Sequence, residues 1–216
     1  MNTTTLLLLL TTAISILANN STSLKEKMLF KPFRINKNLE WHRFFSSGFI
    51  HADWEHLIFN MLSLYLFGTI VEHAFQSTLY FAKNGTFFYI LLYITSVPIS
   101  LLYTYFRNKS KSNYASLGAS GAVSAVIFSA ILIDPTIQIG LFLIPPIIPG
   151  YLFGPLFLIA AAWMGKKGKD NINHAAHIAG ALYGWVFTIT ATYIEHDNLK
   201  PIHTFISIVQ KNLGLE

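Results

Sequence analysis

Apolar residues along this chain are gathered into long blocks that short polar segments separate. A helix needs about 20 consecutive apolar residues to cross a bilayer. Six blocks approach or reach that length, at about 3–18, 54–74, 86–106, 120–133, 151–164 and 174–194. Within them the apolar positions are continuous, whereas the helices of soluble proteins confine them to one face. The pattern predicts an all-α polytopic membrane protein with six spans.

Two of these blocks are shorter than a full span. The first has about 16 residues, and a cleaved signal peptide is the alternative interpretation. No basic residue precedes Lys25 and no small-x-small cleavage site lies ahead of Asn19, so we favour a retained helix. The fourth block is also short, and we expect it to begin inside the bilayer, with Ser120 below the headgroups.

The segments outside the spans carry their own patterns. In 20–50, basic residues alternate with aromatic and other apolar ones, which indicates an ordered loop lying partly in the membrane interface. In 201–216, apolar residues recur at helical spacing, as in an amphipathic helix on the membrane surface. No internal repeat or second domain is evident, so we expect one membrane domain over 1–216.

Composition agrees with this interpretation and excludes several functions. The chain is 53% hydrophobic and only 12% charged, against about 25% charged in soluble domains. It has no cysteine, which rules out disulfides, thiolate metal sites and a cysteine nucleophile. The net charge of +5 comes from residues in the loops, where contact with lipid headgroups explains it. We therefore expect the bilayer as a partner, and no nucleic acid.

Candidate chemistry gathers at one face of the predicted bundle. Because successive spans alternate in direction, spans two, four and six all begin at the same face. The polar residues near those three starts are His51, His56, Asn60, Ser120, His174 and His177. Ionisable residues inside a membrane are costly and usually functional. The topology alone therefore predicts a polar site at this face.

These residue types suit nucleophilic catalysis. Serine is a weak nucleophile until a base takes its proton, and histidine is the usual base. Ser120 lies between glycines at the start of an apolar helix, and His177 is the candidate base. His56 and Asn60, together with the backbone N–H at the helix start, could stabilise an oxyanion. No acidic residue lies within a span where it could orient the base, and Asp53 and Asp170 are candidates only from loops, so we expect a dyad rather than a triad.

The sixth span contains Gly180-x-x-x-Gly184, with both glycines on one helical face. Small residues at this spacing let two membrane helices approach closely. We expect the sixth span to pack against the fourth there, which would bring the candidate base to the candidate nucleophile.

Three motifs together resemble the rhomboid family of intramembrane serine proteases. They are Gly118-Ala119-Ser120-Gly121, the set His51, His56 and Asn60, and Ala176-His177-x-x-Gly180-x-x-x-Gly184, within about Trp41 to Tyr193. The resemblance implies a six-helix bundle that cleaves single-span transmembrane proteins near the membrane surface without metal or organic cofactor. It implies Ser120 as nucleophile, His177 as general base, and His56 and Asn60 at the oxyanion. Gly118 would shape the turn, with His51, Gly180 and Gly184 in support.

Two positions bear on how closely the chain follows the family. Many bacterial members carry a tyrosine four residues after the serine, where it stacks on the base, but this chain has Ser124. Another group must then hold His177, and His174 and Tyr183 are candidates. Glu72 matches the glutamate that orders the loop region in relatives.

Two other function classes fit parts of the pattern. Zinc could be bound by His51, His56, His174 and His177. The chain has no His-Glu-x-x-His motif, few carboxylates lie near these histidines, and zinc would leave the serine motif unexplained. A non-catalytic rhomboid-like protein that binds membrane clients is the other alternative, although such relatives typically lose the serine or the histidine.

Orientation in the membrane receives conflicting signals. The loops after spans one, three and five hold most of the basic residues, and the positive-inside rule would place that face in the cytoplasm. The resemblance implies an extracytoplasmic active site, which we follow. The lack of an arginine-rich amphipathic start favours a bacterial inner membrane. The sequence indicates neither the physiological substrate nor the oligomeric state.

Overall fold

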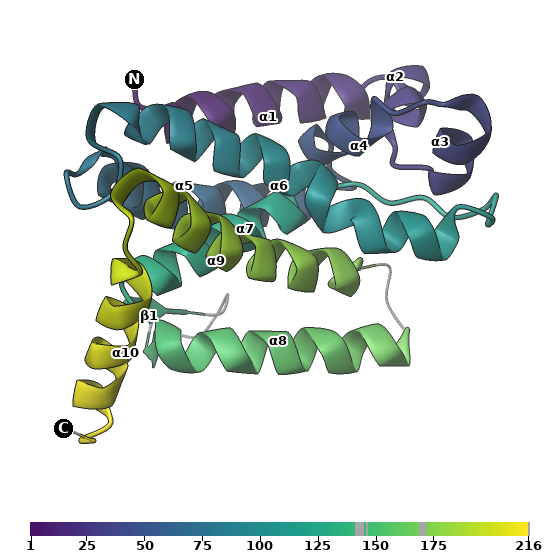
Figure 1. The fold of residues 1–216 in the computed structure, drawn as a ribbon. Coiled ribbons are helices and arrows are strands. Elements are labelled where there is room, and N and C mark those ends of the chain that lie inside the picture. Colours follow the sequence, from purple (N-terminus) through teal and green to yellow (C-terminus); the bar gives the residue numbers. More distant parts are fainter. Residues whose placement is uncertain (141–144, 146, 169–171, 216) are drawn as a thin grey trace.

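The computed structural model of the chain describes residues 1–140, 145, 147–168 and 172–215. It is a bundle of α-helices with a small hairpin (Figure 1). Each of the six predicted spans is a helix: α1 Thr3–Asn19, α5 Trp54–Gln76, α6 Gly85–Asn108, α7 Ser120–Ile133, α8 Gly150–Lys167 and α9 His174–His196. The predicted all-α helical bundle is confirmed.

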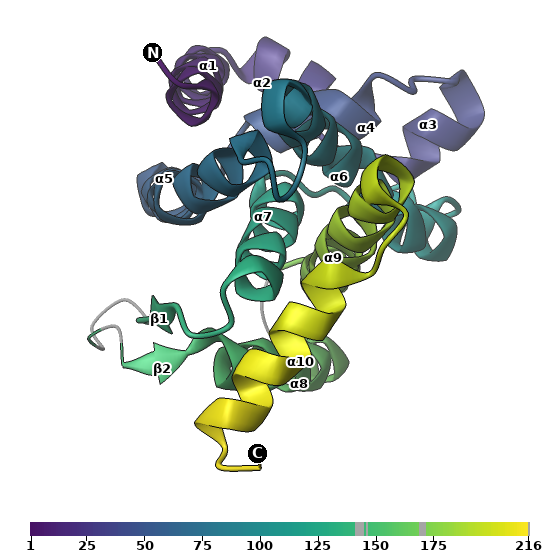
Figure 2. The ribbon, with the colours of Figure 1, turned by 60° about the vertical axis from the view of Figure 1, so that its left-hand side comes forward.

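Helix α7 lies at the centre of the bundle, between α5, α6 and α9 (Figure 2). Its residues are apolar or small on all sides, and nearly all of them are buried. A helix that is apolar all round is typically buried on every side. With 14 residues, α7 is about 21 Å long, which is less than the roughly 30 Å of hydrocarbon in a bilayer.

Polarity in the outer helices is the reverse of that in a soluble protein. On α1 the residues that face the bundle include Thr4, Thr11 and Ser15, whereas Leu9 and Leu17 are exposed by 57% and 61%. Small and hydroxylated residues at helix contacts with leucines outside are typical of membrane bundles. By length and composition alone, two segments of the described chain could cross a membrane, Trp54–Gln76 and Ala82–Asn108.

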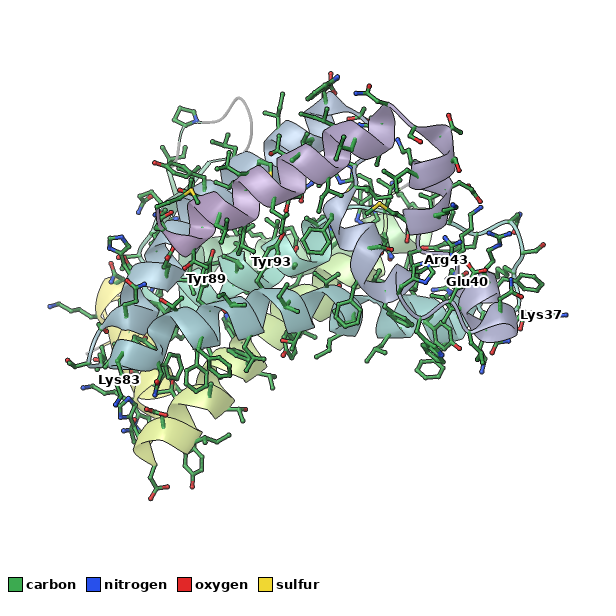
Figure 3. All side chains as sticks on the ribbon, turned by 90° about the horizontal axis from the view of Figure 1, so that it is seen from above. Lys37, Glu40, Arg43, Lys83, Tyr89 and Tyr93 are labelled. Atoms are coloured by element: carbon green, nitrogen blue, oxygen red, sulfur yellow. The ribbon has the colours of Figure 1, made fainter. Side chains whose placement is uncertain are left out.

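Helix α1 is held at its first turn by Glu72, near the end of α5. The Glu72 carboxylate accepts hydrogen bonds from the backbone N–H groups of Thr3 and Thr4, at 2.7 and 2.9 Å, and from Thr4 Oγ1 at 2.7 Å. Tyr89 and Tyr93 of α6 lie beneath α1 (Figure 3), and the Tyr89 hydroxyl is 3.0 Å from Thr4 Oγ1. The expectation that Glu72 orders the loop over 20–50 is wrong. Glu72 lies near the C-terminal end of α5, whereas that loop leads into the N-terminal end of the same helix.

The segment 20–50 is ordered, as its aromatic residues predicted. It contains α2 Thr22–Met28, α3 Pro32–Asn38, α4 Arg43–Ser46 and the 3₁₀ turn η1 Ser47–Phe49. The Arg43 side chain, 2% exposed, donates to the Glu40 carboxylate and to the carbonyls of Glu26 and Leu29 (Figure 3). An antiparallel bridge between Phe30 and Ser116 joins the segment to the approach to α7.

Beyond α7 the chain forms a small hairpin that the sequence did not indicate. Strands β1 Gln138–Ile139 and β2 Ile148–Pro149 pair in antiparallel register ahead of α8. The apolar run Ile139 to Ile144 could also be a lead-in to the fifth span, but Ile139 lies in β1 and 141–144 lie outside the described residues. A further 3₁₀ turn, η2 Ala82–Asn84, precedes α6.

The predicted amphipathic helix near the C-terminus is α10, Lys200–Asn212. It runs across the direction of α8 (Figure 1) and places Phe205 against Trp185 of α9, with ring centroids 5.4 Å apart. This crosswise orientation is the one that a helix lying on the membrane surface would have. Its position on the membrane, and the single domain over 1–216, stay predictions.

Candidate active site

Ser120 is the first residue of α7, and His177 lies in the first turn of α9. The His177 Nε2 atom is 2.7 Å from Ser120 Oγ, which is a hydrogen-bond distance. The backbone N–H of a residue at a helix start has no partner within the helix, and the helix dipole is positive there. The structure therefore joins a hydroxyl, an imidazole and an anion-favouring helix end at one point.

Close contact between α7 and α9 fixes this pair. A Cβ atom added at Gly180 would lie 2.0 Å from the Gly121 carbonyl oxygen, and one at Gly184 would lie 2.1 Å from that of Ala125. Ser129 Oγ donates to the Gly184 carbonyl at 3.0 Å, further along the same contact. The predicted packing of the sixth span on the fourth is confirmed, and backbone touches backbone there.

The turn before Ser120 requires a glycine. Gly118 has a φ of +119°, a conformation that side chains rarely allow. A Cβ atom there would lie 2.7 Å from Cε1 of His56. The Gly118 N–H donates to the Ser47 carbonyl at 2.9 Å. The turn thus brings the chain directly beside the His56 ring.

His56 and Asn60 lie on the first two turns of α5 and share a cavity with the serine and histidine. Asp53 caps this helix by accepting from the His56 N–H at 2.8 Å, and Asn60 Nδ2 donates to the His56 carbonyl at 2.8 Å. The cavity has a volume of about 760 Å³, and Ser120, His56, Asn60 and His177 all line it. The residues predicted for the site are therefore brought together.

His51 lies beneath the cavity rather than in it. Its Nδ1 is 2.8 Å from Ser15 Oγ, and its Nε2 accepts a long hydrogen bond of 3.4 Å from the Ala119 N–H. Nδ1 therefore carries the proton and donates to Ser15, whose hydroxyl donates to the Phe49 carbonyl at 3.1 Å. The ring is fully buried, and burial lowers the pKa of His51 to about 3, so that it is neutral.

The ring that stacks on His177 comes from α8. Phe157 lies with its centroid 6.3 Å from that of His177 at an interplanar angle of 29°, and His174 meets the same ring edge-on at 5.9 Å. Of the two candidates for this support, His174 is in contact, whereas the Tyr183 hydroxyl bonds to Thr95 Oγ1 at 2.6 Å. Sequence reasoning missed Phe157 because nothing distinguishes one aromatic residue in an apolar helix from the next.

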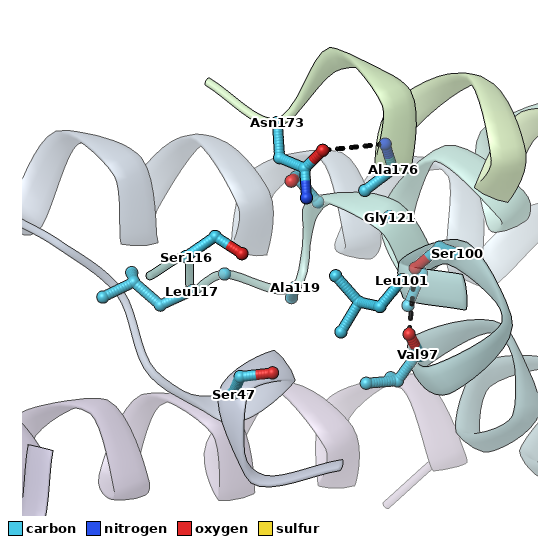
Figure 4. Close-up of a pocket in the computed structure, with 13 residues that line it drawn as sticks. Ser47, Val97, Ser100, Leu101, Ser116, Leu117, Ala119, Gly121, Asn173 and Ala176 are labelled. Atoms are coloured by element: carbon cyan, nitrogen blue, oxygen red, sulfur yellow. Dashed lines mark hydrogen bonds between the residues drawn. The ribbon is translucent and has the colours of Figure 1, made fainter. Parts of the chain in front are cut away.

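A second, much smaller cavity lies beside the turn that contains Ser120 (Figure 4). Its volume is about 20 Å³, and its lining includes Ser47, Ser100, Ser116, Asn173 and the turn 118–122. Within the described part of the chain, Ser47 Oγ, Ser116 Oγ and Asn173 Nδ2 are buried without a hydrogen-bond partner. A single water needs about 10–15 Å³ and two to four polar partners. The cavity matches one water molecule beside the serine.

Metal chemistry gains no support from the described residues. Among them, no group of three or more histidines, aspartates and glutamates is arranged to hold a metal ion. His51, one of the four candidate zinc ligands, bonds to Ser15 and to the Ala119 backbone. Asp170, a loop candidate for orienting the base, lies outside the described residues.

These features define a class, a helical membrane bundle with a serine and a histidine in contact at the ends of two adjacent helices. Comparison with known proteins gives the family. The model of the Rhomboid domain matches residues 38–194, so this chain belongs to the rhomboid family. Members are integral membrane proteins, generally intramembrane serine proteases that act on membrane proteins within the bilayer, although some are inactive.

Individual relatives are distant. The chain is 33% identical over 150 residues to RHOMBOID-like protein 12, mitochondrial, of Arabidopsis thaliana, covering 65% of this chain and 43% of the relative. It is 30% identical over 154 residues to Rhomboid-like protein 11, chloroplastic, of the same plant, covering 68% and 51%. Rhomboid protease AarA of Providencia stuartii is 24% identical over 196 residues, covering 84% and 66%.

The chain spans about half the length of the first two of these curated relatives. Their names place them in two organelles, whereas the third comes from a bacterium. The relatives therefore support an integral membrane protein, but they give the expected bacterial inner membrane no support.

Proposed function

We propose that this chain is an intramembrane serine endopeptidase that cleaves single-span transmembrane proteins near the membrane surface, with Ser120 and His177 as a catalytic dyad. The observation that carries the proposal is the 2.7 Å contact between Ser120 Oγ and His177 Nε2 on the wall of a 760 Å³ cavity. A serine is activated when a base within hydrogen-bond reach can take its proton.

In the first half of the reaction, His177 Nε2 takes the proton of Ser120 as Oγ attacks the scissile carbonyl carbon. The carbonyl oxygen becomes an oxyanion, which the Ser120 backbone N–H, His56 and Asn60 stabilise. His177 then passes the proton to the amide nitrogen, the C–N bond breaks, and an acyl-enzyme with a free amine remains.

In the second half, water attacks the acyl-enzyme with His177 again acting as the base. The proton that His177 takes from water returns to Ser120 Oγ when the ester bond breaks. The small cavity beside Ser120 has the volume and the polar lining to hold one such water close to the reaction. Water is otherwise scarce inside a membrane bundle, so a site of this kind would matter for hydrolysis.

His51 and Gly118 act on the nucleophile through the turn that leads to it. His51 is held neutral, and its Nε2 accepts from the Ala119 N–H directly before the nucleophile. Gly118 allows this turn and the contact with His56. Gly180 and Gly184 hold α9 against α7. All four are positioning residues in this proposal.

A substrate would reach the cavity between α5 and α8, since Phe59 of α5 and Phe157 of α8 both line it. A transmembrane helix would have to unwind locally, because the dyad needs an extended peptide. The bacterial inner membrane stays a prediction from the sequence.

The first experiment is labelling of the purified protein in detergent by a fluorophosphonate, which reacts with activated serines. Wild type is compared with Ser120→Ala and His177→Ala. The matched control is Ser124→Ala, because Ser124 lies one turn further along α7 and lines the same cavity. We expect labelling of wild type and the control, and loss of labelling in the other two variants.

A second measurement is cleavage of a model single-span substrate in proteoliposomes. Wild type should release the product, and Ser120→Ala should not. Equal labelling of all four proteins would overturn the dyad. Absence of both labelling and cleavage in wild type would instead support a non-catalytic member of the family.

A further inference from the structure

We propose that Phe157 is a positioning residue for His177, so that the base is correctly oriented only while α8 is packed against the bundle. The inference rests on the proposed function, since it assigns a partner to the proposed general base. It adds a residue of α8 to a site whose other members come from α5, α7 and α9.

The geometry around the His177 ring carries the proposal. Ser120 Oγ bonds to its Nε2 atom, His174 contacts the ring edge-on, and Phe157 stacks on the ring at 6.3 Å and 29°. An imidazole can turn about its bond to Cβ, and a ring stacked on its face limits that rotation. Phe157 therefore keeps Nε2 directed at the serine hydroxyl.

Phe157 is itself fixed by other rings. It stacks on Phe153 of its own helix at 5.8 Å and meets Phe128 of α7 at 5.6 Å. Phe128 is 2% exposed and belongs to the bundle core. A run of aromatic contacts thus leads from the core of the nucleophile's helix through α8 to the base on α9.

Backbone hydrogen bonds from Gly150 and Tyr151 hold the first turn of α8 to the segment that follows α7, whereas further along α8 the contact with α7 is made by side chains. A Cβ atom added at Gly154 would lie 3.7 Å from the Phe128 ring, which is ordinary contact distance. The outward face of α8 carries large exposed apolar residues, Leu152, Leu156, Ile159 and Trp163. Movement of α8 relative to α7 would change ring contacts first, and those rings include the one on the base.

Phe157 also lines the large cavity, so a plain substrate contact is the competing interpretation. The two roles differ in a measurable way. A residue that only contacts substrate changes KM and leaves the intrinsic reactivity of the serine unchanged. A residue that orients the base changes that reactivity even when no peptide substrate is present.

The test compares Phe157→Leu, Phe157→Tyr and the matched control Phe153→Leu with wild type. Phe153 is a more deeply buried ring on the same helix, and its ring contact is with Phe157 and not with the base. The readouts are the rate of fluorophosphonate labelling, kcat and KM for a model transmembrane substrate, and the melting temperature.

We expect Phe157→Leu to lower the labelling rate and kcat about tenfold, with KM within about twofold of wild type. Phe157→Tyr keeps a ring in place and should hold both rates within about threefold of wild type. Phe153→Leu removes one of the two rings that contact Phe157 but leaves Phe128 in place, so its rates should also stay within about threefold of wild type.

Three results would overturn the inference. The first is an unchanged labelling rate in Phe157→Leu. The second is a change in KM alone, which would make Phe157 a substrate contact. The third is an equal loss in both leucine variants in step with melting temperature, because activity would then follow the packing of α8 as a whole. Failure of wild type to label would instead count against the proposed function.

Discussion

Helices α8 and α9 both pack against the central helix α7, and they do so in different ways. Between α7 and α9 the glycines Gly180 and Gly184 allow backbone to touch backbone. Between α7 and α8 the contact is made by aromatic rings, with Phe128 against Phe157. At these two glycines the first contact is between backbones, whereas the second contact consists of side chains.

The difference separates two requirements of the candidate site. The distance between Ser120 and His177 depends on the α7–α9 contact, which cannot widen or narrow without moving backbone. The orientation of the His177 ring depends on α8 as well, through Phe157. In this arrangement the backbone contact between α7 and α9 brings Ser120 and His177 together. The orientation of the His177 ring depends on the side-chain contact with Phe157, which can form and break.

The largest effect should come from filling the rigid contact. In Gly180→Ala the new Cβ would overlap the Gly121 carbonyl oxygen, so the helices must separate. We expect destabilisation by about 3 kcal/mol. Misplacement of the pair by about 1 Å should lower the labelling rate about a hundredfold. Denaturant unfolding in detergent and fluorophosphonate kinetics measure the two effects, and wild-type values for both would contradict the described packing.

An intermediate effect concerns the turn before α7, which His51 ties to α1. The pKa of His51 is lowered to about 3 in the folded protein, whereas the unfolded value is about 6.5. Between pH 3 and pH 6.5 the unfolded chain binds more protons at His51 than the folded chain does. The contribution of His51 to folding stability is therefore constant above about pH 6.5 and falls as the pH decreases toward 3. At pH 5 the loss should be about 2 kcal/mol.

The measurement is the free energy of unfolding at pH 7 and pH 5 for wild type and His51→Asn. The other histidines are present in both proteins, so the difference between the two losses reports His51 together with its coupling to the neighbouring His56. A variant with the same loss of stability as wild type would show that His51 does not stay neutral in the fold.

The smallest effect should come from the same glycine-to-alanine change in the α7–α8 contact. The Cβ of Gly154→Ala fits at 3.7 Å from Phe128, and alanine stabilises a helix interior by about 0.5–1 kcal/mol relative to glycine. Labelling should match wild type. A loss as large as that of Gly180→Ala would remove the distinction between the two contacts.

Much of the fold could be predicted because continuous apolar blocks in a sequence indicate membrane helices. The α7–α9 contact also followed from the sequence, since two glycines four residues apart have few other uses in such a helix. Alternating span direction then brought Ser120, His177 and the polar start of α5 to one face. These predictions needed only local pattern and connectivity.

The rest depends on which side chains meet across helices, and the sequence carries no marker of that. Phe157 is one of several aromatic residues in an apolar helix, and only the rotation of α8 decides which ring meets the base. Ser15 is a hydroxyl within an apolar block, and its bond to His51 depends on how α1 lies along the bundle. Glu72 was assigned to the wrong partner for the same reason.

Helix α1 is bonded to the rest of the molecule near both of its ends, through Glu72 at the first turn and through Ser15 and His51 close to the last. We therefore expect these contacts to specify the place of α1 even without the covalent link through 20–50. Helix α1 would then bind to the other helices as a separate peptide does to its receptor. Fragment complementation, with α1 supplied as a separate peptide, becomes a route to rebuilding this protein from two pieces.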